Sequence, residues 1–309
     1  MSITKLLGIK YPIFQGAMSH VATHPLVAAV SNAGGLGILA SASWSAERLQ
    51  DEIRKTKALT DKPFGVNLML QMDNIPELVE VIIQEKVKVV TTGAGNPSPY
   101  LPQLKEAGII VFPIIAAVRH AQKMEQLGVD GVIAEGQEAG GHIGSSSTMS
   151  LIPQIVDAVD IPVIAAGGIG DGRSMAAAFA LGARGVQAGT VFLATDESPV
   201  PVRYKEMVVE ANDLGTLVTG RSVNSPVRCL KNDMILKYAE LEQQNASKDE
   251  LEQLTKGSLY KAAVEGDLDN GSAMAGEISG LITEIRSVEE VVESMMAQAK
   301  QVAQTLTIE

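Results

Sequence analysis

Short apolar segments recur through the first two thirds of the chain, and their spacing leaves few folds open. Successive segments start 22 to 31 residues apart. They are continuous rather than alternating, which is typical of strands covered on both faces of a parallel sheet. The eight segments are 12–14, 35–40, 64–70, 87–93, 109–115, 131–136, 162–168 and 185–194.

Segments with helical spacing separate these apolar runs, as at residues 46–57, 75–85, 117–127 and 173–181. Eight strand–helix units in series predict an α/β fold, the (β/α)8 or TIM barrel, which needs roughly 250 of the 309 residues. A doubly wound sheet is the rival fold. Neither its G-x-G-x-x-G turn nor the P-loop pattern occurs in the chain, so the barrel is favoured.

The alternation ends after Ala194. Residues 199 to about 270 hold no run typical of a buried strand, and the highly charged segment 237–256 indicates solvated helix. The chain ends in an amphipathic segment, 288–305, for which Ser287 and Glu290 form a helix-capping pair. We therefore expect a barrel of residues 1–198 plus 281–309, with a small helical lid or substrate domain, 199–280, inserted after strand eight.

Composition excludes several classes of protein. Hydrophobic residues make up 46% of the chain, which is too many for intrinsic disorder. The net charge of −11 disfavours nucleic-acid binding, and the longest apolar run, ten residues, is about half a membrane span. The one cysteine, Cys229, fits a reducing compartment and is expected to be structural rather than nucleophilic. We expect a cytoplasmic protein that binds neither nucleic acid nor membrane.

Glycines cluster after the predicted strands, where barrels of this kind bind their ligands. The loops after strands seven and eight read AAGGIGDG (165–172) and VQAGT (186–190). Backbone N–H groups and the Thr190 hydroxyl there favour a phosphate monoester. The alternative interpretation is that these glycines only make tight turns.

His142 differs from the other three histidines because it lies in EAGGHIG, after strand six, on the presumed ligand face. A histidine framed by glycines can approach a ligand and donate a hydrogen bond or transfer a proton. A structural loop histidine is the alternative. His20 and His24 are four residues apart, but Pro25 disfavours a helix across them. We expect no metal site, because no cluster has metal-ligand spacing.

The chain resembles the FMN-dependent 2-nitropropane dioxygenase-like superfamily. This superfamily contains nitronate monooxygenases and the flavin-type enoyl-acyl-carrier-protein reductase II, the FabK type. The resemblance covers nearly the whole chain. It is carried by YPIFQGAM (11–18), AGGLGIL (33–39), KPFGVNLML (62–70), VVTTGAGNP (89–97), IAEGQEAGGHIG (133–144), IPVIAAGGI (161–169), VQAGT (186–190) and GSAMAGEISG (271–280).

Two positions favour the reductase branch. Glu135 stands where nitronate monooxygenases typically have glutamine, and Ile143 stands where they typically have arginine. Two departures from the reductases are Ala17, where some have glycine, and the serines at 145–147. The resemblance implies reduction of a trans-2-enoyl thioester, in fatty-acid synthesis, by NADH or NADPH through bound FMN. Nitronate monooxygenase is the alternative.

The resemblance also implies roles for individual residues, with His142 as the catalytic residue. Residues expected along the edge of the flavin ring are Gly16, Ala17 and Met18. Residues expected at the flavin or its ribityl chain are Asn67, Glu135 and Gly140. Residues expected at the phosphate are Gly168, Gln187, Ala188, Gly189 and Thr190. Residues expected near the isoalloxazine are Met274, Ala275 and Gly276.

The expected protein partner is the acyl carrier protein, which is acidic and which an enzyme of net charge −11 repels overall. Segment 201–237 is the exception, since its basic residues outnumber its acidic ones. We expect a docking patch among its six basic residues, with an ordinary solvated surface as the alternative. These residues are Arg203, Lys205, Arg221, Arg228, Lys231 and Lys237. A homodimer is compatible with the resemblance.

Overall fold

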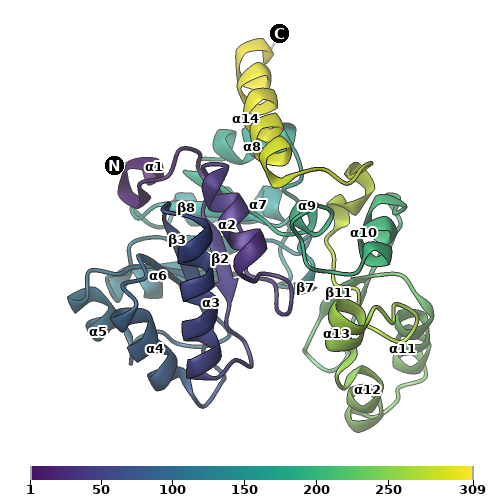
Figure 1. Ribbon diagram of the computed structural model, residues 1–309. Helices are drawn as coiled ribbons and strands as arrows, with labels where there is room; N and C mark the ends of the chain where they lie inside the picture. Colours follow the sequence, from purple (N-terminus) through teal and green to yellow (C-terminus); the bar gives the residue numbers. More distant parts are fainter. Residues whose placement is uncertain (1, 308–309) are drawn as a thin grey trace.

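A ring of eight parallel strands forms the centre of the computed structural model, which describes residues 2–307 (Figure 1). The strands are β1 (Ile13–Gln15), β2 (Gly37–Ala40), β3 (Phe64–Met69), β4 (Val89–Gly93), β5 (Ile110–Ile115), β6 (Val132–Glu135), β8 (Val163–Ala166) and β9 (Gly185–Ala188). Their order in the sheet is β1-β9-β8-β6-β5-β4-β3-β2. A parallel bridge between Phe14 and Leu36 joins the two ends of this series. The predicted (β/α)8 barrel is confirmed.

Helices alternate with these strands and cover the outside of the ring. They are α2 (His24–Asn32), α3 (Ala46–Leu59), α4 (Ile75–Gln84), α5 (Leu101–Glu106), α6 (Val118–Gln126), α7 (Thr148–Val156) and α8 (Gly172–Ala180). A short first helix, α1 (Ile3–Leu7), adds Ile3 and Leu7 to the cluster that fills the barrel interior, with Phe14, Phe112 and Ile164. The amino-terminal end of the barrel is therefore closed by apolar side chains.

The last helix, α14 (Val288–Thr305), packs against α8 and begins at the predicted N-cap, Ser287. A Cβ atom on Gly172 would lie 2.5 Å from the Met295 carbonyl oxygen, so only glycine permits this approach of the two helices. The Gly172 N–H also donates to Gln298 Oε1 at 2.7 Å. Helix α14 thus returns the chain to the barrel.

The segment between β9 and α14 forms a group of helices beside the barrel, and Figure 1 shows α10 to α13 gathered there. Its elements are α9 (Thr190–Leu193), α10 (Val202–Val209), β10 (Thr216–Thr219), β11 (Val227–Leu230), α11 (Asp233–Gln243), α12 (Lys248–Thr255), α13 (Ser258–Tyr260), the π-helix η1 (Lys261–Glu265) and the 3₁₀-helix η2 (Glu277–Leu281). We call residues 199–280 the insertion. Its division from the barrel as a separate domain stays a prediction.

Three local expectations differ from the structure. The eighth strand ends at Ala188 rather than 194, because the chain turns at Gly189 into α9 while residues 190–193 remain buried. Helix α2 begins at His24 in spite of Pro25, since a proline in the first helical turn forfeits no intrahelical bond. The insertion also holds strands: β11 pairs with β10 on one side and with β7 (Gly141–His142) on the other, in an antiparallel three-stranded sheet.

Candidate active site

A cavity of about 850 Å³ lies at the carboxyl ends of the barrel strands. Loops after β1, β3, β4, β5, β6, β8 and β9 line it. The insertion contributes Tyr204, Leu259 and Met274 to the same wall. Barrel loops and insertion therefore enclose one space.

The structure brings the predicted site residues together around this cavity, apart from Ala275. The lining residues are His142, Gly16, Ala17, Met18, Asn67, Glu135, Gly140, Gly168, Gln187, Ala188, Gly189, Thr190, Met274 and Gly276. Ala275 is 1% exposed and lies behind the wall, with its backbone against Gly140. Its predicted contact with the isoalloxazine stays a prediction.

His142 lies on β7, which the insertion holds as one strand of the small sheet. His142 pairs with Val227, and Gly141 pairs with Arg228. The backbone N–H of Ile143 donates to the Pro226 carbonyl at 3.1 Å, which continues the contact past the strand. The His142 side chain is exposed and lines the cavity. A histidine held in this way can present a ring N–H to a ligand.

Glu135 is the last residue of β6, and its partly buried carboxyl group lines the cavity. Within residues 2–307 no hydrogen bond to this carboxyl group is found. Loss of hydration on burial raises the pKa of Glu135 to about 7. The group therefore changes charge near neutral pH, and its neutral form can donate a hydrogen bond.

Gln187, on β9, carries a buried acceptor that lacks a partner. Its side-chain oxygen Oε1 has no hydrogen bond among the described residues, although the residue is only 6% exposed. A Cβ atom on Gly16 would lie 3.3 Å from the Gln187 side chain, so the chain passes close beside the amide. An unpaired buried oxygen at a cavity wall suits a ligand with N–H donors, which a flavin ring has.

The two loops expected to hold a phosphate differ in whether their polar groups already form hydrogen bonds within the protein. Gly167 and Gly168 both have positive φ, at 87° and 72°, a turn that glycine adopts without strain. In the other loop the Thr190 oxygen already accepts a hydrogen bond of 2.8 Å from Gly276 N–H. Its hydroxyl hydrogen remains available to a ligand, so both loops fit a phosphate.

Two further polar groups, not predicted from the sequence, lie at this wall. The Glu138 carboxylate accepts hydrogen bonds from Thr148 N–H at 2.9 Å and from the Thr148 hydroxyl at 2.9 Å. The Tyr204 hydroxyl donates to the Met274 carbonyl at 2.9 Å, and burial raises the Tyr204 pKa. Glu138 could have been predicted, because it is the first residue of the EAGGHIG motif, whereas no pattern in the residues around Tyr204 indicates a place in the site. Burial also raises the pKa of the Cys229 thiol to about 12, which leaves it unreactive at neutral pH.

The expected basic docking patch loses two members. Lys205 is 7% exposed, and its ammonium group donates to the Thr195 carbonyl at 2.6 Å. Arg228 is 6% exposed and is bonded on all sides by protein groups. Neither side chain is available to a partner protein, because both are buried and their N–H groups already form hydrogen bonds or an ion pair within the chain. Arg203, Arg221, Lys231 and Lys237 remain exposed.

Among residues 2–307, no three His, Cys, Asp or Glu side chains are placed to hold a metal ion. The described helices include none with the length and apolar character needed to cross a membrane.

This geometry defines the class of protein: a TIM barrel whose ligand cavity lies between the carboxyl ends of the strands and an insertion. The chain belongs to the nitronate monooxygenase family, whose model matches residues 1–298. It is similar to the solved structure of FabK from Thermotoga maritima, with 46% identity and a TM-score of 0.95 over 98% of this chain and 97% of that one.

Two named sequences are similar over almost their full length. The (3aS,4S,5R,7aS)-5-hydroxy-7a-methyl-1-oxo-octahydro-1H-indene-4-carboxyl-CoA dehydrogenase of Rhodococcus jostii is 35% identical, covering 96% of this chain and 95% of its own length. A probable nitronate monooxygenase of Staphylococcus saprophyticus is also 35% identical, covering 97% of this chain and 98% of its own. These relatives are oxidoreductases, and so is this chain.

Proposed function

We propose that the chain is an FMN-dependent enoyl-thioester reductase that uses NADH or NADPH to reduce a trans-2-enoyl group carried on acyl carrier protein. The observation that carries this proposal is the 46% identity to FabK over 98% of the chain, with His142 exposed in the cavity. The Rhodococcus relative supports the substrate class, because its name specifies a carboxyl-CoA substrate, which is a thioester.

The cavity residues fit FMN. The unpaired Gln187 oxygen and the Glu135 carboxyl group would form hydrogen bonds with polar atoms of the flavin, and for Gln187 this replaces the phosphate contact expected from the resemblance. The glycine loops at 167–168 and 189–190 would hold the phosphate. When bound, FMN supplies the hydride transfer between the nicotinamide and the enoyl group. The protein supplies the orientation of both substrates in the cavity.

His142 provides the polar chemistry at the substrate. Reduction of an enoyl thioester builds negative charge on the thioester oxygen and requires a proton at the α-carbon. An N–H group inside the cavity can meet either demand, and the ring of His142, which lines the cavity, carries such a group. His142→Ala should retain bound flavin but lose turnover by on the order of 100- to 1000-fold, as when one donor to a developing oxyanion is removed. Near-normal turnover in this variant would remove His142 from the reaction.

Nitronate oxidation by oxygen is the second candidate function, favoured by the family model and by the Staphylococcus relatives. One assay separates the two. The purified protein is given NADH or NADPH anaerobically, then crotonyl thioester; a parallel sample receives a nitronate and oxygen. We expect the flavin absorption to bleach with the nicotinamide and to recover with the thioester. Turnover confined to the nitronate sample would overturn the reductase proposal.

A further inference from the structure

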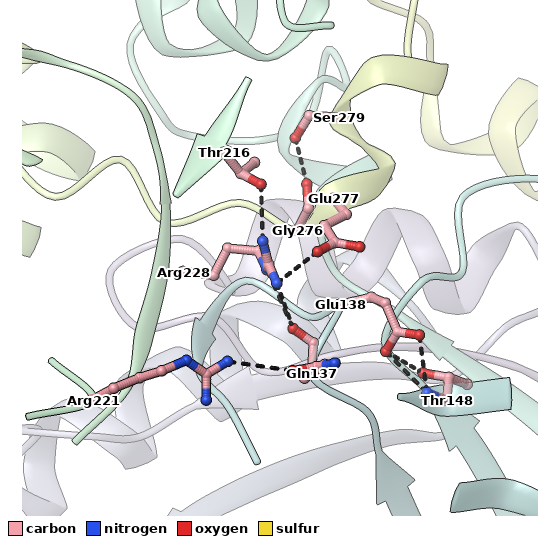
Figure 2. A network of polar contacts seen from close by, with 9 residues as sticks. All are labelled: Gln137, Glu138, Thr148, Thr216, Arg221, Arg228, Gly276, Glu277 and Ser279. Atoms are coloured by element: carbon pink, nitrogen blue, oxygen red, sulfur yellow. Dashed lines mark hydrogen bonds and ion pairs between the residues drawn. The ribbon is translucent and has the colours of Figure 1, made fainter. Parts of the chain in front are cut away.

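Arg228, on β11, is a buried cation between three separate segments of the chain (Figure 2). Its Nε and Nη2 donate to the Gln137 carbonyl oxygen at 3.2 and 3.0 Å. Its Nη1 donates to Thr216 Oγ1 at 3.1 Å, and Nη2 lies 2.7 Å from Glu277 Oε1. The guanidinium thus joins the β6–β7 loop, β10 and the start of η2.

The partner of Arg228 fixes the next residue of the same loop. The Glu277 backbone N–H donates to the Glu138 carbonyl oxygen at 2.9 Å. Two consecutive carbonyl groups, of Gln137 and Glu138, are therefore held by Arg228 and by its ion-pair partner. The Glu138 side chain is held as well, by Thr148 on α7, as Figure 2 shows.

This loop leads directly to His142, and the other end of the His142 strand depends on β11 too. Gly141 pairs with Arg228 itself, and His142 pairs with Val227. Arg228 consequently holds β7 twice, by backbone pairing beside the histidine and by its side-chain bonds to Gln137, five residues before the histidine. The backbone at His142 has little freedom while these contacts persist.

We propose that Arg228 is a positioning residue for His142: its guanidinium holds the β6–β7 loop so that β7 presents the histidine ring to the cavity. The inference rests on the proposed function, since it assumes that His142 acts in turnover. It also makes the insertion part of the catalytic arrangement, because the strand that carries Arg228 belongs to the insertion and not to the barrel.

The contacts require arginine rather than any cation. A guanidinium has five N–H donors in a rigid planar fork, so it can serve Gln137, Thr216 and Glu277 together. A lysine ammonium is a single point that cannot reach three acceptors spread around such a fork. Arg228→Lys therefore keeps the positive charge but loses the planar arrangement of donors, so it tests the hydrogen bonds separately from the charge.

The test compares Arg228→Lys with Arg203→Lys, an exposed arginine in the same insertion that pairs with Glu206 and Glu210. We expect Arg228→Lys to lower kcat by about tenfold to 100-fold, the scale of a misplaced catalytic group, with little change in FMN affinity or thioester KM. Arg203→Lys should match the wild type. Unchanged kcat in Arg228→Lys overturns the inference, and so does an equal loss in both variants.

A double-mutant cycle with His142→Ala separates positioning from a general structural effect. If Arg228 acts through His142, Arg228→Lys should change the residual turnover of His142→Ala by less than about twofold, because nothing remains to be positioned. Full multiplication of the two losses would overturn the inference. Near-normal turnover in His142→Ala alone would instead overturn the proposed role of His142, so the two failures are distinguishable.

A readout without turnover completes the test. The rate of His142 carbethoxylation by diethyl pyrocarbonate, followed by peptide mass spectrometry, reports how the ring is presented. We expect this rate to change at least about twofold in Arg228→Lys, while the rate at His120, which is also exposed at the cavity, stays constant. The same rate at His142 in both proteins would show that Arg228 does not set the position of the histidine.

Discussion

At the scale of single residues, Glu135 is the group whose ionisation depends most on the fold. Its pKa is raised from 4.5 to about 7 by burial alone. The folded protein therefore holds this proton more tightly than the unfolded chain does. The resulting stabilisation is fully present below pH 4.5 and is lost as the pH rises through 7. The sign follows from desolvation, which penalises the carboxylate and not the neutral acid.

Glu135→Gln, which cannot ionise, should remove this dependence. We expect the flavin-free variant to gain free energy of unfolding over the wild type as the pH rises from 5 to 8, by up to about 3 kcal/mol. Urea unfolding of both proteins across that range measures the difference. Glu106→Gln, at an exposed glutamate, is the control and should run parallel to the wild type. A constant difference between Glu135→Gln and wild type would contradict the raised pKa.

At the scale of elements, the sequence predicts those strands, helix ends and loops whose signal lies in neighbouring residues of the chain. The barrel strands are visible because both of their faces are buried, as in β2 and β8, where every residue is buried. The start of α14 is visible because Ser287 and Glu290 cap each other. The site loops are visible because they follow the strands at one end of the ring.

The three-stranded sheet has no such local signal. Strand β7 has two residues, and it is a strand only because β11, some 85 residues later, lies beside it. Strand β10 is mostly half-buried, so its four residues form no apolar run. The predicted docking role of Arg228 fails for the same reason, because its charge is apparent in the sequence and its burial depends on distant partners.

Gly140 tests how closely the elements around β7 must pack. A Cβ atom there would lie 2.6 Å from the Ala275 carbonyl carbon and 2.8 Å from the Gly276 nitrogen, which are backbone atoms that cannot move independently. We expect Gly140→Ala to lower the free energy of unfolding by about 1–3 kcal/mol and to weaken FMN retention. Urea unfolding and flavin fluorescence measure both effects.

The control for this substitution is Gly108→Ala, at a glycine with φ of 72° and no atom near a new Cβ. It carries the conformational penalty of a left-handed alanine, about 1 kcal/mol, without a clash. FMN retention should be normal in Gly108→Ala and reduced in Gly140→Ala. Equal flavin retention in the two variants would mean that the contact between Gly140 and residues 275–276 does not shape the site.

At the scale of the whole molecule, the two ends of the barrel differ. Ile3 and Leu7 of α1 close the amino-terminal end with apolar side chains, whereas the carboxyl-terminal end opens into the cavity beside the insertion. Under the proposed function, a substrate bound to a large carrier would approach from the side of the insertion. The protein has a net charge of −11, so an acidic carrier needs local cations there.

Arg221 is the exposed cation best placed to meet such a carrier. It lies next to the cavity loop, with Nη2 3.3 Å from Gln137 Oε1, and it forms no ion pair among the described residues, unlike Arg203.

We expect Arg221→Glu to raise KM for carrier-bound enoyl substrate by about fivefold, equivalent to about 1 kcal/mol. KM for a coenzyme A thioester should stay unchanged, and the difference should shrink as salt screens the charges. Lys300→Glu, at an exposed position of α14, supplies the matched charge reversal away from the cavity. Equal rises in KM for both substrates would assign Arg221 to the substrate pocket and not to carrier docking.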